Sequence, residues 1–283
     1  MELIADYACA TGENPLWHSA EGALYWCDIP RGRIFRYDPR TGRHAICHEG
    51  TVVGGFTVQT DGSLLLFMER GAVRVWRDGL LRTISEELDG EQESRFNDVI
   101  ADPLGGVFCG TMSTPSRPGR LYRMAPDGSM SVVQEDVGCS NGLTFTLDAH
   151  AMYHTDSLSR TIYSYRFDGK TGAVTHRNTF AQLAVSDGLP DGITLDAEGC
   201  LWSAQWGGGC VLRLDPDGRE LMRLRMPCPL VSSVAFGGER LQHLYITTAG
   251  GDDRAANGPF AGALFRADLG IRGWPQYTSR VCL

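Results

Sequence analysis

The sequence lacks the cysteine patterns, long apolar runs and basic excess that mark several protein classes. Its nine cysteines are scattered singly, their number is odd, and none forms a Cys-x-x-Cys pair. This pattern argues against a zinc ribbon and against a secreted disulfide framework. We therefore expect most of the cysteines to be small core residues in a reducing compartment.

No stretch approaches the roughly 18 uninterrupted apolar residues that a transmembrane helix needs. The N-terminus, Met-Glu-Leu-Ile-Ala-Asp, has no basic region followed by an apolar run, unlike a secretory leader. The 26 Lys and Arg residues are outnumbered by 34 Asp and Glu residues, which gives a net charge of −8. We therefore expect a cytoplasmic protein with no membrane partner. We also expect no nucleic-acid partner, because a basic footprint for phosphate is missing.

Short apolar runs recur through the 283 residues, each after a turn rich in Gly, Asp or Glu. These runs lie at 23–26, 107–109, 151–153, 200–202 and 243–245. A further strand-like segment follows each run, as in Gly-Arg-Ile-Phe-Arg-Tyr-Asp-Pro at 32–39. The expected strands are short, the turn signals are frequent, and no helical period is sustained. This pattern predicts an all-β fold.

Aligning the repeats places six residues at one equivalent position: Glu13, Phe56, Asn97, Asn141, Asp191 and Ser233. Successive members are separated by 41 to 50 residues, the length of one β-propeller blade of three or four strands. Six such units nearly exhaust the chain. The sequence therefore predicts that residues 1–283 form a single six-bladed β-propeller domain. We expect the stretch 3–7 to pair with the last blade and close the ring, which would remove an exposed edge.

Five of the six equivalent residues carry side-chain oxygen atoms at the start of the strand that lines a propeller's central channel. Two carboxylates there, those of Glu13 and Asp191, would repel each other unless a cation lay between them. Carboxylate and amide oxygens are ligands of hard divalent cations, and no His or Cys occupies the position. Taken singly, Asn141-Gly142 and Asp191-Gly192 are also typical turn dipeptides. Their shared position favours a metal site in the channel.

Two other aspartates, Asp28 and Asp156, end the second strand of their repeats at the same mouth of the channel. Two roles fit these aspartates equally well: hydrogen bonding to the metal ligands, or capping of local turns. His150 and His154 are four residues apart on a predicted strand, so they do not form a helical metal-binding pair. His18 is most simply a loop residue.

Five segments resemble the signature blocks of the senescence-marker-protein, gluconolactonase and luciferin-regenerating-enzyme family. They are Gly-Glu-Asn-Pro-Leu-Trp at 12–17, Arg-Phe-Asn-Asp at 95–98, Cys-Gly-Thr-Met at 109–112, Ser-Asn-Gly-Leu at 140–143 and Pro-Asp-Gly-Ile at 190–193. Their order and spacing are similar to those of the family over essentially the whole chain. The resemblance implies a six-bladed propeller that holds one divalent ion in its channel and hydrolyses sugar lactones to aldonic acids.

The resemblance also implies roles for individual residues. Glu13, Asn141 and Asp191 would be the metal ligands, and the ion would be Ca, Zn, Mn, Mg or Fe. Arg95 and Asn97 would bind the substrate, a small-molecule sugar lactone, with Asn97 close enough to the ion to be a further ligand directly or through water. Our hypothesis is that Asp191 is also the general base, which passes the proton of the attacking water to the leaving ring oxygen.

Two departures from the family pattern bear on the substrate. Asn14 replaces the second glycine of the usual Gly-Glu-Gly-Pro block, and the stretch 113–119 is short and carries no acidic residue. Some relatives, the animal regucalcins among them, have a longer segment there with a glutamate that faces the substrate. The identity of the sugar therefore stays open.

Two other functions are compatible with the same residues, because propellers host many activities. One is a calcium-binding regulatory or scaffold protein whose channel ion is structural. The other is a propeller esterase or phosphotriesterase that uses the same oxygen-ligated ion.

Overall fold

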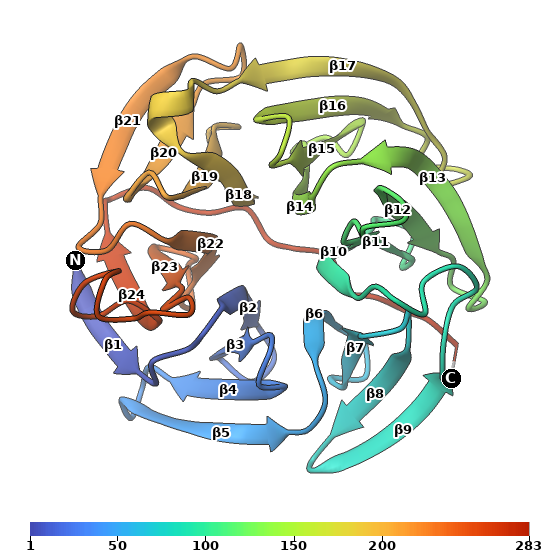
Figure 1. Cartoon of the computed structure of the whole chain (residues 1–283), viewed down its shortest axis with the longest axis horizontal. Coiled ribbons are helices and arrows are strands. Elements are labelled where there is room, and N and C mark those ends of the chain that lie inside the picture. Colours follow the sequence, from blue (N-terminus) through green and yellow to red (C-terminus); the bar gives the residue numbers. More distant parts are fainter. Residues whose placement is uncertain (283) are drawn as a thin grey trace.

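The computed structural model describes residues 1–282, which form six four-stranded antiparallel sheets arranged in a ring (Figure 1). The prediction of an all-β, six-bladed β-propeller is confirmed. One strand of each blade lies beside the central axis: β2 (Gly12–His18), β6 (Val53–Val58), β10 (Phe96–Ala101), β14 (Ser140–Phe145), β18 (Leu189–Leu195) and β22 (Val231–Gly237). The one helix among the described residues is the single turn η1 (Val185–Asp187). No helix of residues 1–282 is long and apolar enough to cross a membrane.

Three further strands complete each blade toward the outside of the ring. The second strands are β3 (Ala23–Asp28), β7 (Leu64–Met68), β11 (Val107–Thr111), β15 (Ala151–Asp156), β19 (Leu201–Trp206) and β23 (His243–Thr248). The third strands are β4 (Arg33–Asp38), β8 (Val73–Arg77), β12 (Gly119–Met124), β16 (Thr161–Phe167), β20 (Cys210–Leu214) and β24 (Ala263–Asp268). The outermost strands are β5 (Arg43–Glu49), β9 (Leu80–Ser85), β13 (Met130–Val137), β17 (Val174–Gln182), β21 (Glu220–Arg225) and β1 (Glu2–Asp6).

The N-terminal strand closes the ring, as the sequence predicts. β1 pairs antiparallel with β24, so the first residues of the chain complete the blade that the last strands begin. An ion pair between Arg266 and Glu2 at 2.6 Å joins the two strands. The pairing covers an edge of β24 that would otherwise expose unpaired backbone groups.

The apolar core is divided among the six interfaces between neighbouring blades. Inward-facing side chains of adjacent sheets pack against each other there, as for Trp26, Phe35 and Tyr245 between the last and first blades. The other five interfaces have equivalent clusters. All nine cysteines are free. Six of them are buried and five of these belong to the apolar clusters, which agrees with their expected role.

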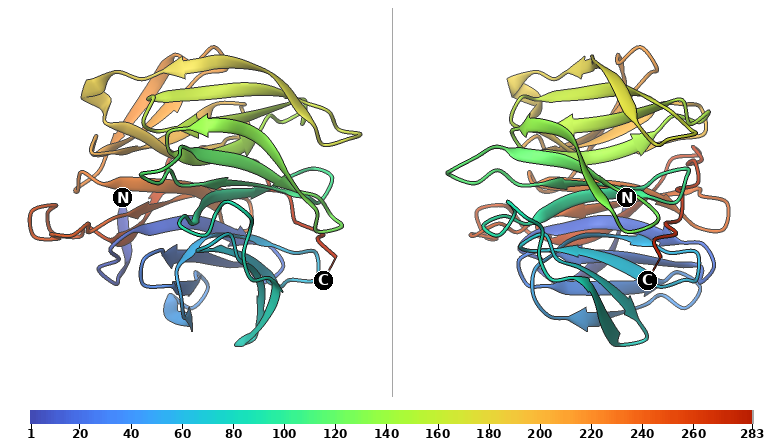
Figure 2. Two further views of the ribbon diagram at one scale, coloured as in Figure 1. Left: turned by 45° about the vertical axis from the view of Figure 1, so that its right-hand side comes forward. Right: turned by 90° about the vertical axis from the view of Figure 1, so that its right-hand side faces the viewer.

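The C-terminal segment 269–282 crosses one mouth of the central channel (Figure 1) and runs along that face of the ring (Figure 2). Gly273 forms a β-bridge with Asp196 of the fifth blade, and Ser279 forms one with Gln59 of the second blade. The backbone N–H of Arg280 donates to the carbonyl of Gly105 in the third blade at 2.7 Å. This crossing segment covers one end of the channel, and the other end is free of it.

Glycines allow the inner strands to approach each other around the axis. Gly142 lies inside β14 and Gly192 inside β18, so neither dipeptide identified above forms a turn. A Cβ atom on Gly142 would lie 2.5 Å from the backbone N of Ile193 and 2.6 Å from the carbonyl O of Asp191. The glycine is therefore required by the close approach of β14 and β18.

We predict that Gly142→Ala destabilises the protein by about 1–3 kcal/mol, because the added methyl group would force two packed strands apart. Thermal unfolding monitored by circular dichroism would measure the change. Gly169→Ala is the matched control, since no atom lies within 4 Å of a Cβ built there and its φ is not positive. Equal melting temperatures for the two variants would contradict the close-approach explanation.

Candidate metal centre

The open end of the channel contains a cavity of about 240 Å³. The five residues that the sequence singles out, Glu13, Arg95, Asn97, Asn141 and Asp191, all line it. The remaining lining residues are Thr11, Met112, Cys139, Ser157, Leu158, Leu189 and Trp206. Residues from four blades, separated by up to 178 positions in the chain, therefore meet at one place.

A one-residue bulge at the start of each inner strand directs these side chains into the channel. In β14, Ser140 pairs with Asp156 of β15, and regular pairing resumes only at Leu143 with His154. The same shift occurs in all six blades. Asn97, Asn141 and Asp191 are the first residues after the last pair that precedes it, and Glu13 belongs to that last pair, opposite Cys27. A bulge breaks the alternation of side chains and re-aims them, so it determines what faces the axis.

In β6 and β22, the residue at the bulge differs from the one that the sequence alignment placed at the equivalent position. The residue that follows the initial pair is Gly54 rather than Phe56 in β6, and Ser232 rather than Ser233 in β22. Ser232 Oγ donates to the carbonyl of Gly12 at 2.5 Å, as Asn97 Nδ2 donates to the carbonyl of Ser140 at 2.8 Å. In both cases the acceptor is the first paired residue of the next blade.

Asn14 stands where the family pattern has a glycine, and its backbone adopts a conformation that glycine favours. Its φ is +48°, in the left-handed region that favours glycine and that asparagine tolerates better than most residues. Its backbone N–H donates to Glu13 Oε2 at 2.9 Å, and its Oδ1 accepts from the N–H of Phe56 at 2.5 Å. Asn14 thus orients the Glu13 carboxylate toward the channel.

A chain of hydrogen bonds links the predicted substrate residues to the predicted ligands. Arg95 Nη1 donates to Asn97 Oδ1 at 2.6 Å, and Asn97 Nδ2 donates to Asn141 Oδ1 at 2.7 Å. Asn141 Nδ2 donates to Ser157 Oγ at 2.7 Å, and this hydroxyl donates to the carbonyl of Pro190 at 2.6 Å. Pro190 precedes Asp191, so the chain holds the amide of Asn141 in a fixed position between Arg95 and Asp191.

Three buried carboxylates share this part of the channel with one largely buried guanidinium. Burial, followed by the nearby Asp98 charge, holds the pKa of Glu13 well above its ordinary value. Burial and then the Glu13 charge do the same to the pKa of Asp191. Burial raises the pKa of Asp98 to about 7, although the positive charge of Arg95 opposes the shift. Desolvation makes the ionised form of each carboxylate costly.

The residues fit a divalent cation. Asp191 Oδ1 is buried and has no hydrogen-bond partner among residues 1–282, although it lines a cavity. If all three carboxylates are ionised beside charged Arg95, two negative charges are uncompensated, which one divalent cation would balance. No group of three or more His, Cys, Asp and Glu side chains in the described chain is placed to hold a metal. The candidate site therefore needs the amide oxygen of Asn141 as its third ligand, and such oxygen donors suit hard cations.

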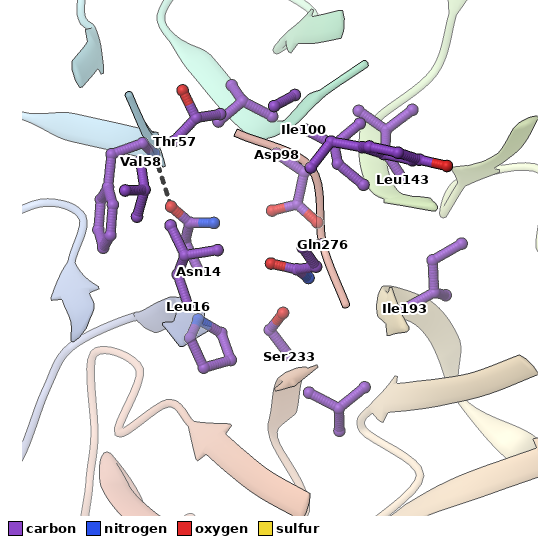
Figure 3. A pocket seen from close by; sticks show the side chains of 16 residues that line it. Asn14, Leu16, Thr57, Val58, Asp98, Ile100, Leu143, Ile193, Ser233 and Gln276 are labelled. Carbon is purple, nitrogen blue, oxygen red and sulfur yellow. Dashed lines mark hydrogen bonds between the residues drawn. The ribbon is translucent and has the colours of Figure 1, made fainter. Parts of the chain in front are cut away.

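The sequence interpretation missed two residues of this centre, Ser157 and Asp98. Asp98 faces a separate cavity of about 30 Å³ toward the covered mouth of the channel. Figure 3 shows Asp98, Asn14, Ser233 and Gln276 pointing toward the middle of this small cavity. Adjacent residues on a regular strand face opposite sides, so only the bulge explains why both Asn97 and Asp98 point into the channel.

The other polar candidates have structural roles. Asp28 accepts hydrogen bonds from the N–H groups of Ala10 and Thr11, and Asp156 accepts them from Gly138 and Cys139. Each aspartate thus caps the segment that leads into a predicted ligand, Glu13 or Asn141. His154 is buried against Ser140 Oγ at 2.8 Å, and burial lowers its pKa to about 4. The imidazole of His18 bonds with the carbonyl of Gly62 at 3.1 Å, outside the lining of the 240 Å³ cavity.

The short stretch 113–119 is held beside the cavity rather than over it. Arg117 forms an ion pair with the fully buried carboxylate of Glu91, which also accepts a hydrogen bond from Tyr122 at 2.6 Å. Thr114 and Arg117 form a β-bridge that closes a tight turn. No residue from 113 to 119 lines the 240 Å³ cavity, so this stretch contributes no side chain to it.

A sequence model of the SMP-30/Gluconolactonase/LRE-like region matches residues 11–250, which include all five predicted site residues. The chain belongs to this family. It is 48% identical over 287 residues to the pentonolactonase XacC of Haloferax volcanii, covering 99% of this chain and 98% of the relative. It is 36% identical over 281 residues to the 6-deoxy-6-sulfogluconolactonase of Pseudomonas putida, covering 96% of each chain.

The propeller is also similar to a solved family structure. The calcium-binding protein regucalcin of Agrobacterium tumefaciens superposes with a TM-score of 0.89 at 25% identity, covering 100% of this chain and 97% of that one. The family resemblance in the sequence is thus confirmed over nearly the whole chain.

The buried carboxylates predict an unusual pH dependence for the metal-free protein. Because the folded-state pKa values of Glu13, Asp98 and Asp191 lie above the ordinary values near 4, the folded protein binds more protons than the unfolded chain. Stability should therefore fall as pH rises above about 4, and the contribution of Asp98 should be lost as pH passes through about 7. Thermal melts of chelated protein between pH 5 and pH 8 would measure the slope.

Asp98→Asn should make this slope shallower, because one of the three titrating groups is removed. Asp252→Asn, at an exposed loop carboxylate, is the matched control and should leave the slope unchanged. A metal-free protein whose melting temperature rises with pH across this range would contradict the assignment.

Proposed function

We propose that this protein is a metal-dependent lactonase that hydrolyses a sugar lactone to its aldonic acid. The observation that carries the proposal is the convergence of Glu13, Asn141 and Asp191 around an unpaired, buried carboxylate oxygen in an open cavity. The lactonase names of two relatives that match nearly the full chain support the same activity. A lactone is a cyclic ester, so the enzyme is a carboxylic ester hydrolase.

Glu13, Asn141 and Asp191 would hold one divalent ion through two carboxylates and one amide oxygen. When bound, such an ion supplies Lewis-acid polarisation of a carbonyl and lowers the pKa of water. Three protein ligands leave coordination positions open, which is typical of a catalytic rather than a structural site. The calcium-binding name of the A. tumefaciens relative supports a hard cation. The donor set is compatible with Ca, Mg, Mn, Fe or Zn.

Asp191 would act as the general base. Its carboxylate accepts a proton from the attacking water as the water oxygen bonds to the lactone carbonyl carbon. The same proton then passes to the ring oxygen as the ring C–O bond breaks, which yields the hydroxyl and carboxylic acid of the open chain. A carboxylate has two oxygen atoms, so Asp191 would bind the ion through one of them and accept the proton on the other.

Arg95 and Asn97 would orient the substrate. The two hydrogen bonds that the Arg95 guanidinium donates within residues 1–282 both use Nη1, which leaves Nε and Nη2 to donate to sugar hydroxyls or a developing oxyanion. The Asn97 side chain already makes three hydrogen bonds, to Arg95, Ser140 and Asn141. Asn97 therefore acts chiefly by fixing Arg95 and Asn141 relative to each other.

Asp191→Asn tests the base. The variant keeps an oxygen ligand but lacks a group that accepts a proton, so we expect kcat to fall by about 10²–10⁴-fold. Metal binding, measured by calorimetry, should weaken less than in Glu13→Ala, which removes a ligand oxygen altogether. Asp187→Asn, beside the same strand but outside the cavity lining, is the control. Unchanged turnover in a metal-loaded Asp191→Asn protein would contradict the assignment.

Chelation followed by restoration of single ions tests the metal requirement. We expect acid release from a panel of sugar lactones, corrected for spontaneous opening, to disappear with chelator. It should return with one or more of Ca, Mg, Mn, Fe or Zn. Loss of the folded structure on chelation, without any lactonase activity before it, would instead favour a calcium-binding regulatory or scaffold protein. Faster turnover of aryl esters or phosphotriesters than of lactones would favour the esterase alternative.

A further inference from the structure

The hydrogen bonds that connect Arg95 with Pro190 all run in one direction, and this direction determines how the Asn141 amide is turned. A guanidinium can only donate hydrogen bonds, and a backbone carbonyl can only accept them. Arg95 Nη1 donates to Asn97 at 2.6 Å, so the Asn97 atom that faces the guanidinium is the oxygen Oδ1. The Ser157 hydroxyl lies 2.6 Å from the carbonyl of Pro190, so its single proton is committed to that carbonyl.

Ser157 consequently acts as an acceptor toward Asn141. Because the hydroxyl gives its proton to Pro190, the Asn141 atom 2.7 Å away must be a donor, the amide nitrogen Nδ2. On the other side, Asn97 uses its Oδ1 for Arg95, so its Nδ2 requires an acceptor, which is Asn141 Oδ1 at 2.7 Å. If the Asn141 amide were turned over, its nitrogen would face the Asn97 nitrogen and its oxygen would face a hydroxyl without a free proton. Both neighbours therefore select the same orientation.

This orientation is the one that a metal ligand needs. Asn141 lines the 240 Å³ cavity, and its amide oxygen is the third ligand of the candidate site. An amide oxygen has two lone pairs, so accepting from Asn97 leaves one for a cation. The Nδ2 hydrogens, which would repel a cation, are both given to other acceptors: Ser157 Oγ at 2.7 Å and Cys139 Sγ at 3.5 Å.

We propose that Ser157 is a positioning residue of the metal centre, whose hydroxyl accepts from the Asn141 amide and so holds Oδ1 as the ligand atom. This inference rests on the metal site of the proposed function, but it does not depend on which lactone is hydrolysed. The same hydroxyl bonds the carbonyl of Pro190, the residue before Asp191. One side chain therefore fixes two of the three proposed ligands relative to each other.

Ser157→Ala tests this role through metal affinity rather than turnover. Titration calorimetry of the metal-free protein with Ca²⁺, Mn²⁺ and Zn²⁺ in turn would give the Kd of each ion. We expect the Kd to rise by about 10- to 30-fold in the variant, because the hydroxyl no longer holds the amide of Asn141. A water molecule in place of the hydroxyl would not restore the affinity, since water donates as readily as it accepts.

Ser203→Ala is the matched control. Ser203 is fully buried, and its hydroxyl accepts from the side-chain amide of Gln205 at 2.8 Å, outside the lining of the 240 Å³ cavity. Each variant loses one buried hydroxyl that accepts from an amide, so thermal melts of the two metal-free proteins should show similar losses of stability. Of the two, only Ser157→Ala should weaken metal binding.

Asn141→Asp provides a second test, because a carboxylate presents an oxygen atom whichever way it is turned. In that background, Ser157→Ala should change the Kd by about threefold or less. A Kd that Ser157→Ala leaves unchanged, or raises equally with and without Asn141→Asp, would overturn the inference. Metal binding without hydrolysis of any lactone would overturn the proposed function and leave this role of Ser157 standing. A wild-type protein that binds no divalent ion would overturn both.

Discussion

The central constraint in this molecule is the burial of three carboxylates around one arginine. Glu13, Asp98 and Asp191 are each less than 10% exposed, and their mutual repulsion adds to the cost of removing them from water. Arg95 supplies one compensating charge. The remaining imbalance can be relieved by taking up protons or by binding a divalent cation. The pH response of the metal-free protein and its proposed metal dependence are therefore two consequences of the same arrangement.

The propeller makes this burial possible by distributing the charged groups over separate blades. The inner strands β2, β10, β14 and β18 each contribute one or two side chains beside the initial bulge, and these strands are otherwise held by regular pairing. The glycines that follow Asn141 and Asp191 let these strands approach closely. The crossing segment 269–282 covers one mouth, so a ligand would enter from the side where Leu158 and Trp206 lie. Strands rather than loops thus position the polar residues of the channel, which are Glu13, Asn97, Asn141 and Asp191.

Much of this could be predicted from the sequence, because a propeller repeats. The spacing of Asn97, Asn141 and Asp191 located the inner strands, and Glu13 followed from the same alignment. Asp98 could not be predicted, since strand alternation would point it away from the axis and only the bulge brings it inward. Ser157 lies after β15, and its contact with Asn141 depends on tertiary packing. The pairing of Glu91 with Arg117, 26 residues apart and without a periodic pattern, likewise left no sequence signal.

One measurement tests the central claim directly: the number of protons released when the metal-free protein binds a divalent ion. Titration calorimetry near pH 6.5 in two buffers with different ionisation enthalpies would give this number. If the charges of Glu13, Asp98 and Asp191 act on one another as described, the ion should displace about 1–2 protons, and Asp98→Asn should reduce the number. Binding with no proton release, and with the same enthalpy in both buffers, would contradict the account.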